Sequence, residues 1–211
     1  MKKLKRVFII LGLFLIYILL SIFSYSNAVS TDISNSVFRL HVIANSNSRE
    51  DQELKYSIRD ALISYMNSIS KDIKTKEEAI NLANENKEEF YNIAKKVIED
   101  NGYNYDINIE IGNFPFPTKT YGDIALPAGF YDALKVEIGS ASGKNWWCVM
   151  FPSLCFVDVS NGVVPEESKE TLEANLETED YNLIASDNVE YKVKFKLVDL
   201  FENAKIIMAK K

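Results

Sequence analysis

Few residues in this chain could do chemistry. There is one histidine, His41, and there are two cysteines, Cys148 and Cys155. A zinc site usually needs three or four nitrogen or sulfur ligands, and the six residues between the cysteines match no common zinc motif. His41 beside either thiol could instead generate a nucleophilic thiolate, but no nucleophile elbow or cysteine-protease signature is present. We therefore expect no metal site and no catalytic residue.

The other polar residues give no better sign of catalysis. Carboxylates are plentiful but no pair stands apart, and the glycines at 139–143 fit no phosphate-binding or dinucleotide-binding loop. We expect no cofactor and no small-molecule substrate. Four of the 24 basic residues lie in the first six positions, so the rest carries 20 basic against 30 acidic residues, a net charge of −10. A body this acidic argues against nucleic-acid binding, which needs basic patches.

The most apolar stretch outside the N-terminus is 145–156, which contains both tryptophans and both cysteines. In a strand, Trp146 and Trp147 point to opposite faces. One of them is expected to pack in the core, and the other faces covering helices or solvent. An exposed tryptophan is a candidate binding anchor, because tryptophan is enriched at interface hot spots.

The N-terminus has the pattern of an export segment. Four of the five residues 2–6 are basic, no charge occurs from Val7 to Phe23, and Ser26 and Ala28 are small residues placed for a cut after Ala28. The uncharged run is also just long enough to span a bilayer. Residues 1–28 are thus a cleaved signal peptide or a retained membrane anchor. In both cases the domain at 33–211 lies outside the cytoplasm.

Export allows the two cysteines to be oxidised. A Cys148–Cys155 disulfide would close a short loop around Pro152 and stabilise the fold by about 2–3 kcal/mol. Two free buried thiols are the alternative, because export permits a disulfide without requiring it. We favour the disulfide.

Periodicity predicts the elements that position these residues. Apolar residues at helical spacing follow capping signals at Ser48 and Thr75, and the second helix is expected to run to Asn101. Alternating apolar residues predict the strands. The prolines of 114–117 argue that this segment is a connection. Strands are expected at 37–44, 105–111, 134–138, 146–151, 154–159 and 189–198, and a last short helix at 200–208. The fold class is α+β, a single domain whose mixed or antiparallel sheet is covered by amphipathic helices.

Three groups of residues resemble the motifs of a known family. Residues 39–48 form the first, with polar residues Arg39, His41, Asn45 and Ser46. The second is 116–129, which contains Phe-Pro-Thr-Lys, Tyr-Gly and Leu-Pro-Ala-Gly, and the third is Asn-Trp-Trp-Cys-Val-Met-Phe-Pro at 145–152. In order and spacing, residues 37–158 are similar to the stage II sporulation protein R family. Phe130 and Ser153 depart from its usual pattern.

The resemblance implies a signalling role without catalysis. Proteins of this family are exported by the forespore into the space between the two membranes. There they activate a membrane-embedded aspartic protease of the mother cell, which processes pro-sigma-E. The expected partners are this protease, as the receptor, and the membrane, which residues 7–23 would enter. The candidate contact or contact-supporting residues are Phe116, Pro117, Lys119, Tyr121, Asn145, Trp146, Trp147, Phe151 and Pro152.

Two other functions remain open at this point. The chain could be an exported cysteine-dependent hydrolase that uses His41 with Cys148 or Cys155. It could also be a structural protein held by its N-terminal helix.

Overall fold

A mixed sheet of four strands forms the centre of the molecule, which we describe from a computed structural model for residues 2–155, 164–185 and 189–209. The strand order is β2-β5-β1-β6. The first strand, β1 (Phe38–Ile43), lies between β5 (Gly129–Ile138), to which it is parallel, and β6 (Asn145–Phe151), to which it is antiparallel. β2 (Ile107–Phe116) pairs with β5 at one edge. The predicted α+β class with a mixed sheet is confirmed.

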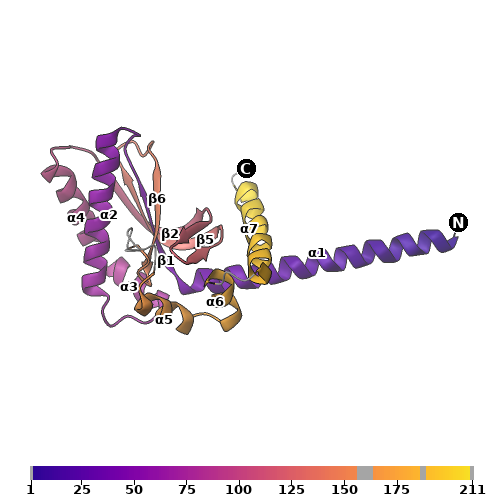
Figure 1. The fold of residues 1–211 in the computed structure, drawn as a ribbon. Helices are drawn as coiled ribbons and strands as arrows, with labels where there is room; N and C mark the ends of the chain where they lie inside the picture. Colours follow the sequence, from indigo (N-terminus) through magenta and orange to yellow (C-terminus); the bar gives the residue numbers. More distant parts are fainter. Residues whose placement is uncertain (1, 156–163, 186–188, 210–211) are drawn as a thin grey trace.

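Three helices cover one face of the sheet (Figure 1). They are α2 (Arg49–Ile69), α3 (Lys76–Glu85) and α4 (Lys87–Asp100). Side chains at Ser48 and Thr75 cap α2 and α3 as predicted. The single helix expected from Thr75 to Asn101 is wrong in one respect, because the chain leaves helical geometry at Asn86 and so forms two helices.

The second face is covered by a hairpin, three short or amphipathic helices and the end of α1 (Figure 1). The hairpin consists of β3 (Lys119–Tyr121) and β4 (Ile124–Leu126). The helices are α5 (Glu166–Ala174), α6 (Thr178–Ala185) and α7 (Val189–Ala209). The sheet therefore has an apolar core on each side, one under α2–α4 and one under the hairpin and α5–α7.

Two strand predictions fail for physical reasons. The segment 114–117, predicted to be a connection, is mostly strand, because β2 continues through Pro115 to Phe116. β2 lies at the edge of the sheet, so the missing N–H of Pro115 can face outward, where no neighbouring strand needs a donor. The segment 189–198 is the first half of α7 and contains no strand. It alternates because this helix carries apolar residues on both a buried and an exposed face. The short strand expected at 154–159 lies mostly outside the described residues, and Leu154 and Cys155 are not in a strand.

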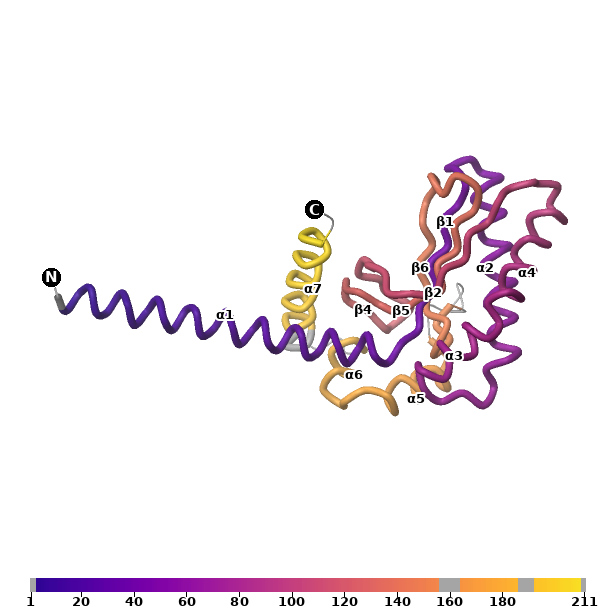
Figure 2. The backbone as a smooth tube through the Cα atoms, turned by 180° about the vertical axis from the view of Figure 1, so that it is seen from behind, coloured from indigo at the N-terminus to yellow at the C-terminus, as the bar shows by residue number. Residues whose placement is uncertain are grey.

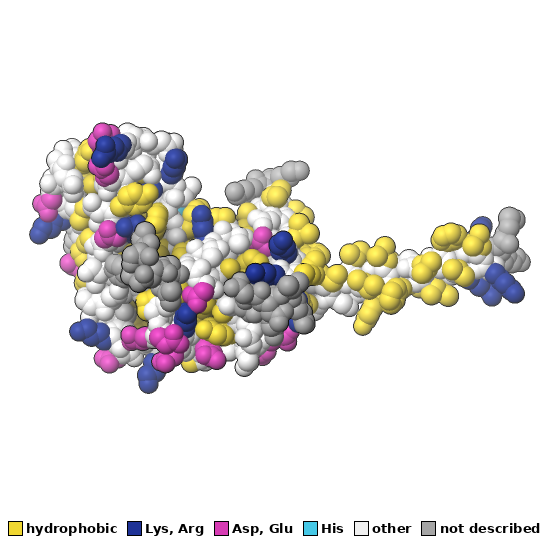
Figure 3. Space-filling view, in the orientation of Figure 1, with side chains coloured by type: hydrophobic (Ala, Val, Ile, Leu, Met, Phe, Trp, Pro, Cys, Tyr) yellow, Lys and Arg dark blue, Asp and Glu magenta, His cyan; other side chains and the backbone are white. Residues whose placement is uncertain are grey.

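The N-terminal helix α1 (Lys2–Ser36) is continuous from the basic leader into the body. Figure 2 shows its first two thirds projecting away from the body, and Figure 3 shows hydrophobic side chains along this projecting length. By length and composition it could cross a membrane. Its last turns are packed: Val29 and Ile33 belong to the core of the second face.

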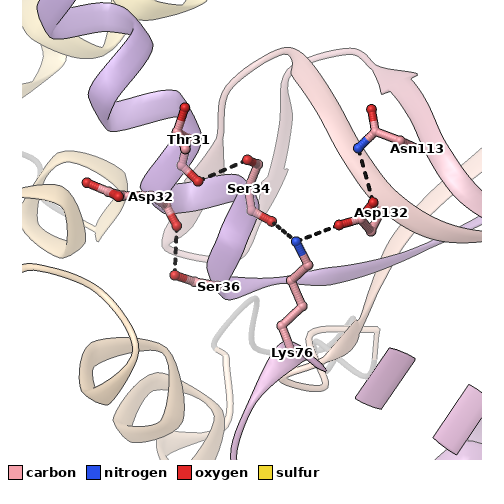
Figure 4. Close-up of polar contacts among 7 residues, drawn as sticks. All are labelled: Thr31, Asp32, Ser34, Ser36, Lys76, Asn113 and Asp132. Atoms are coloured by element: carbon pink, nitrogen blue, oxygen red, sulfur yellow. Dashed lines mark hydrogen bonds and ion pairs between the residues drawn. The ribbon is translucent and has the colours of Figure 1, made fainter. Parts of the chain in front are cut away.

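Polar contacts tie the end of α1 to the body (Figure 4). The buried Lys76 ammonium donates to the Ser34 carbonyl at 2.9 Å and pairs with the Asp132 carboxylate at 2.6 Å. Asn113 donates to the other oxygen of Asp132. One lysine of α3 thus connects α1 with β5.

Candidate partner-binding groove

A groove of about 820 Å³ opens where α2, the β3–β4 hairpin and the start of β6 meet. α2 contributes one wall, the hairpin the opposite wall, and β6 with Leu154 and Cys155 the floor. Basic and aromatic side chains dominate the lining. The residues used below are Lys55, Tyr56, Arg59, Asp60, Lys119, Tyr121, Lys144, Asn145, Trp146 and Trp147.

The charge of this groove is opposite to that of the whole chain. Among the described residues, four cationic side chains line it, from Lys55, Arg59, Lys119 and Lys144, against one carboxylate, that of Asp60. Asp60 is itself paired with Arg59 at 2.6 Å. The protein carries a formal net charge of −6. The groove is therefore a local positive site on an acidic molecule, which attracts acidic ligands selectively.

Lys55 is the most unusual of the four cations because it is buried, with 1% of its surface exposed. Its ammonium donates to the Gln52 side chain at 2.6 Å and to the Lys144 carbonyl at 3.2 Å. Among the described residues it has no ion pair. Burial lowers its pKa to about 8, and the nearby charges of Arg59 and Lys144 act in the same direction. The lysine is still charged at neutral pH, and no described residue supplies a counter-ion.

Arg59 and two aromatic rings form the rim of the α2 wall. The guanidinium lies 4.4 Å from the centre of the Trp146 ring and 4.9 Å from that of Tyr56. The two rings meet edge to face at 5.3 Å. The indole Nε1 of Trp146 is buried and has no hydrogen-bond partner in the part of the chain that the structure describes. The rim thus offers apolar surface and a cation, with the indole Nε1–H buried behind them.

Trp147 lies on the opposite face of β6 from Trp146, as the strand geometry predicts. It stacks on His41 with ring centres 3.7 Å apart and meets Phe116 edge to face. His41 Nε2 is hydrogen-bonded to the Asn145 side chain at 2.7 Å. Burial lowers the pKa of His41 to about 4, so the imidazole is neutral at physiological pH. His41 orients Asn145 and Trp147 at the groove.

Arg39 supports the hairpin wall from inside the protein. It is fully buried, and its guanidinium lies over the Phe116 ring at 4.2 Å and the Tyr131 ring at 4.7 Å. Its Nη2 donates to the Tyr121 hydroxyl at 2.6 Å, and that hydroxyl donates to the Trp147 carbonyl. Arg39 therefore links β1, the hairpin and β6 behind the groove.

The polar residues after β1 hold the loop that carries Lys144. Asn45 Nδ2 donates to Asp51 at 2.9 Å, and Ser46 donates to the same carboxylate oxygen. The Asn45 carbonyl accepts from Ser142 N, and its side-chain oxygen accepts from Ser140 N. These bonds fix the β5–β6 loop against the start of α2. Asn45 and Ser46 thus act as structural residues beside the groove.

Cys148 and Cys155 are joined by a disulfide at the floor of the groove. In this state neither sulfur is a thiolate, and the buried His41 is hydrogen-bonded to Asn145. Within the described ranges, no three His, Cys, Asp or Glu side chains gather as metal ligands would. The groove has the features of a binding surface, and its chemistry does not favour the cysteine-hydrolase alternative.

The structure brings together some of the residues selected from the sequence and separates others. Lys119, Tyr121, Asn145, Trp146 and Trp147 line the groove. Phe116, Phe151 and Pro152 are buried, and Pro117 is exposed. The buried three can support a contact surface but cannot form it.

Sequence reasoning missed the α2 wall, above all Lys55 and Arg59. The sequence did contain a sign of Lys55, because this residue lies on the same face of α2 as the buried Leu54, Ile58 and Leu62. A basic residue on such an apolar face is buried against its usual preference for the surface, and such a residue often has a functional role.

Comparison with known proteins matches the part of the chain that contains the groove. The family model described as stage II sporulation protein R matches residues 34–161. A relative named "Stage II sporulation protein R" from Bacillus subtilis (strain 168) is 40% identical over 147 residues. That match covers 70% of this chain and 66% of the relative, just under two thirds of its length. No solved structure matches.

Proposed function

Because the chain belongs to the stage II sporulation protein R family, and so has a role in sporulation, we propose that it is an exported signal that activates a receptor protease. The forespore would export it into the space between the two membranes. There it would contact a membrane-embedded aspartic protease of the mother cell, which processes pro-sigma-E. The chain itself would break no bond.

The single observation that carries this proposal is the cationic, aromatic groove in an otherwise acidic protein. All its lining residues lie within 34–161, the part of the chain that matches the family model. Aromatic and arginine side chains are the residues most enriched at binding hot spots. A buried lysine that no described residue pairs with is costly for folding, and a ligand carboxylate would supply an opposite charge.

We propose that the groove takes an acidic, partly apolar segment from the outer face of the receptor. Carboxylates of that segment would pair with Lys55, Lys119 and Lys144, and an apolar side chain would contact Trp146. Binding can activate the receptor only if the active state offers this segment better than the inactive state does, because only a difference in affinity shifts an equilibrium.

The test reconstitutes this chain, the receptor protease and the pro-sigma-E substrate in a host that does not sporulate. Arg59→Glu and Lys144→Glu each reverse a charge at the rim of the groove, where the side chains are half-buried or exposed and folding should be kept. Lys96→Glu is the matched control, because it makes the same charge change on an exposed residue of α4.

We expect both groove variants to reduce processing of pro-sigma-E at least tenfold and the control to leave it unchanged. Circular dichroism and thermal unfolding would verify that all three variants fold. Full processing with both folded groove variants would remove the groove from the mechanism.

A further inference from the structure

Helix α7 exposes a stripe of apolar side chains that neither the groove nor the proposed signalling role uses. Its members follow one another at helical spacing along one face of the helix, and their exposed fractions run from 37% to 68%. They are Val193, Leu197, Leu200, Ile207 and Met208, with the exposed Ala204 completing the series. We call these six residues the α7 stripe.

The opposite face of α7 is packed on the body. Val198, Glu202 and Ile206 are buried, and Phe195 is half-buried in the same core. The elements that α7 contacts are α1, α6 and β5. The α7 stripe consequently points away from the body, on the side from which α1 projects. Figure 3 shows hydrophobic side chains gathered at that end of the body.

Basic residues border the α7 stripe. Lys194 lies on one side of it, where its ammonium pairs with Glu179 at 2.9 Å, and Lys192 and Lys196 lie on the other. An apolar stripe bordered by lysines is the pattern of a helix that lies in a membrane surface. Long lysine side chains can reach from such a position to the lipid phosphates.

The position of α7 relative to α1 fits this pattern. The Phe201 ring meets the Phe23 ring edge to face with centres 6.2 Å apart. Phe23 is the last exposed large hydrophobic residue of α1, and one turn later Lys205 contacts the Asn27 side chain. Figures 1 and 2 show α7 at a steep angle to α1. If α1 crosses a bilayer, α7 lies along its outer surface.

We propose that α7 docks on the outer surface of the membrane that α1 crosses, with the α7 stripe at the acyl-chain boundary. The occupant is the lipid bilayer, because the stripe continues the exposed apolar surface of α1 and lies beside the residue where that surface ends. Docking would hold the acidic body in one orientation on the membrane. The inference takes α1 as a retained anchor and does not depend on the receptor.

The experiment uses the full chain in liposomes of phosphatidylglycerol and phosphatidylethanolamine, some with a nitroxide quencher on the acyl chain. A small fluorophore is attached to a single new cysteine, made by Leu200→Cys in the stripe, Leu13→Cys in α1 or Lys96→Cys on α4. We expect strong quenching at positions 13 and 200 and at least threefold weaker quenching at position 96.

A second set of variants tests the stripe itself with the fluorophore on Leu197→Cys. Leu200→Glu with Ile207→Glu should abolish quenching there, whereas Asn203→Glu, an exposed residue of the same helix outside the stripe, should leave it unchanged. All these side chains are exposed, so folding should be kept.

Three results would overturn the proposal. Equal quenching at positions 200 and 96, with position 13 fully quenched, would show an anchored chain whose α7 is away from the lipid. Weak quenching at position 13 would remove the anchor on which the inference depends. Dimers that form in detergent and are lost with Leu200→Glu would assign the stripe to a second copy of this chain. None of these measurements includes the receptor, so they are independent of the proposed signalling function.

Discussion

Two buried basic side chains, Lys55 and His41, have their pKa values lowered mainly by the same cause, the loss of water around the charged form. The outcomes differ because their ordinary pKa values differ. At about 8, Lys55 is still charged at neutral pH and faces the groove. At about 4, His41 is neutral and acts as a hydrogen-bonding, stacking side chain. Lys55 therefore contributes a positive charge to the groove, and His41 holds Asn145 and Trp147 in position.

The charge of Lys55 should cost stability. Lys55→Met removes a buried cation that has no ion pair in the described part of the chain, and water in the open groove can bond to the acceptors that it leaves. We expect the free energy of unfolding at pH 7 to rise by about 1–3 kcal/mol while processing of pro-sigma-E is lost. Denaturant unfolding in a mild detergent measures the first and the reconstituted assay the second. A less stable variant would show that the two hydrogen bonds of Lys55 outweigh its desolvation.

His41 should make the fold sensitive to mild acid. In the unfolded chain its imidazole takes up a proton near pH 6.5, but in the folded chain only near pH 4. Stability that is fully present above pH 6.5 is therefore lost as the pH falls toward 4. Between pH 7 and pH 5 we expect the free energy of unfolding to fall by about 1–2 kcal/mol from this residue.

The measurement compares wild type with His41→Gln at both pH values. Asp180 acts in the opposite direction, because burial, with the nearby Asp32 adding to it, raises its pKa to about 6 and the folded chain gains stability as this group is protonated. Asp180 is common to both proteins, so the difference between them isolates His41. An equal pH dependence in both would contradict the assignment.

Among the elements, the turn after β1 and the β5–β6 loop act as one unit. The loop passes so close to the turn that a Cβ at Gly143 would collide with the Ser46 carbonyl oxygen. Asn45 binds the same loop through its backbone and side-chain oxygens. This contact places Lys144 and Asn145 at the groove, although the two segments are far apart in sequence.

Gly143→Ala tests this close approach. Because the neighbour is backbone and cannot rotate away, we expect a loss of about 1–3 kcal/mol in the free energy of unfolding, together with weaker activation of the receptor. Gly112→Ala is the control, since a Cβ there would meet only the Phe114 ring, at 3.4 Å. Equal small losses for the two variants would show that the loop adjusts freely.

For the whole molecule, the decisive feature is the continuity of α1 from the leader into the core. Ser26 and Val29, which flank the candidate cut after Ala28, are buried with exposed fractions of 1% and 3%. A cut after Ala28 would separate Ser26 and the preceding turns of α1 from the body on which they pack. We propose on this basis that α1 is retained as an anchor.

We expect the chain to stay at full length in the membrane. A C-terminal tag and mass determination after expression in a secreting host would measure this. A soluble product that begins at Val29 would contradict it and would also release α7 from the bilayer. Phe14→Asp, which places a charge in the middle of the uncharged run, should reduce membrane retention and serves as the positive control.

The sequence by itself determined the features that depend on local order along the chain. Periodicity predicted α2 and its cap at Ser48, and the uncharged run predicted α1. Both predictions were possible because the side-chain pattern of a single element depends on residues close together in the sequence. The motif residues indicated the family. The cysteine pair was predicted as a disulfide from export and even number, and the structure has this bond.

Tertiary structure alone decided which distant residues meet. Trp146 was selected from its motif, but Arg59, which covers it, lies 87 positions earlier and becomes its neighbour only because β1 lies between β5 and β6 beneath α2. The helix at 189–209 was likewise hidden, because its two apolar faces, one buried on the body and one exposed, alternate along the chain as a strand would. Strand order and packing partners depend on interactions between elements, which local periodicity does not encode.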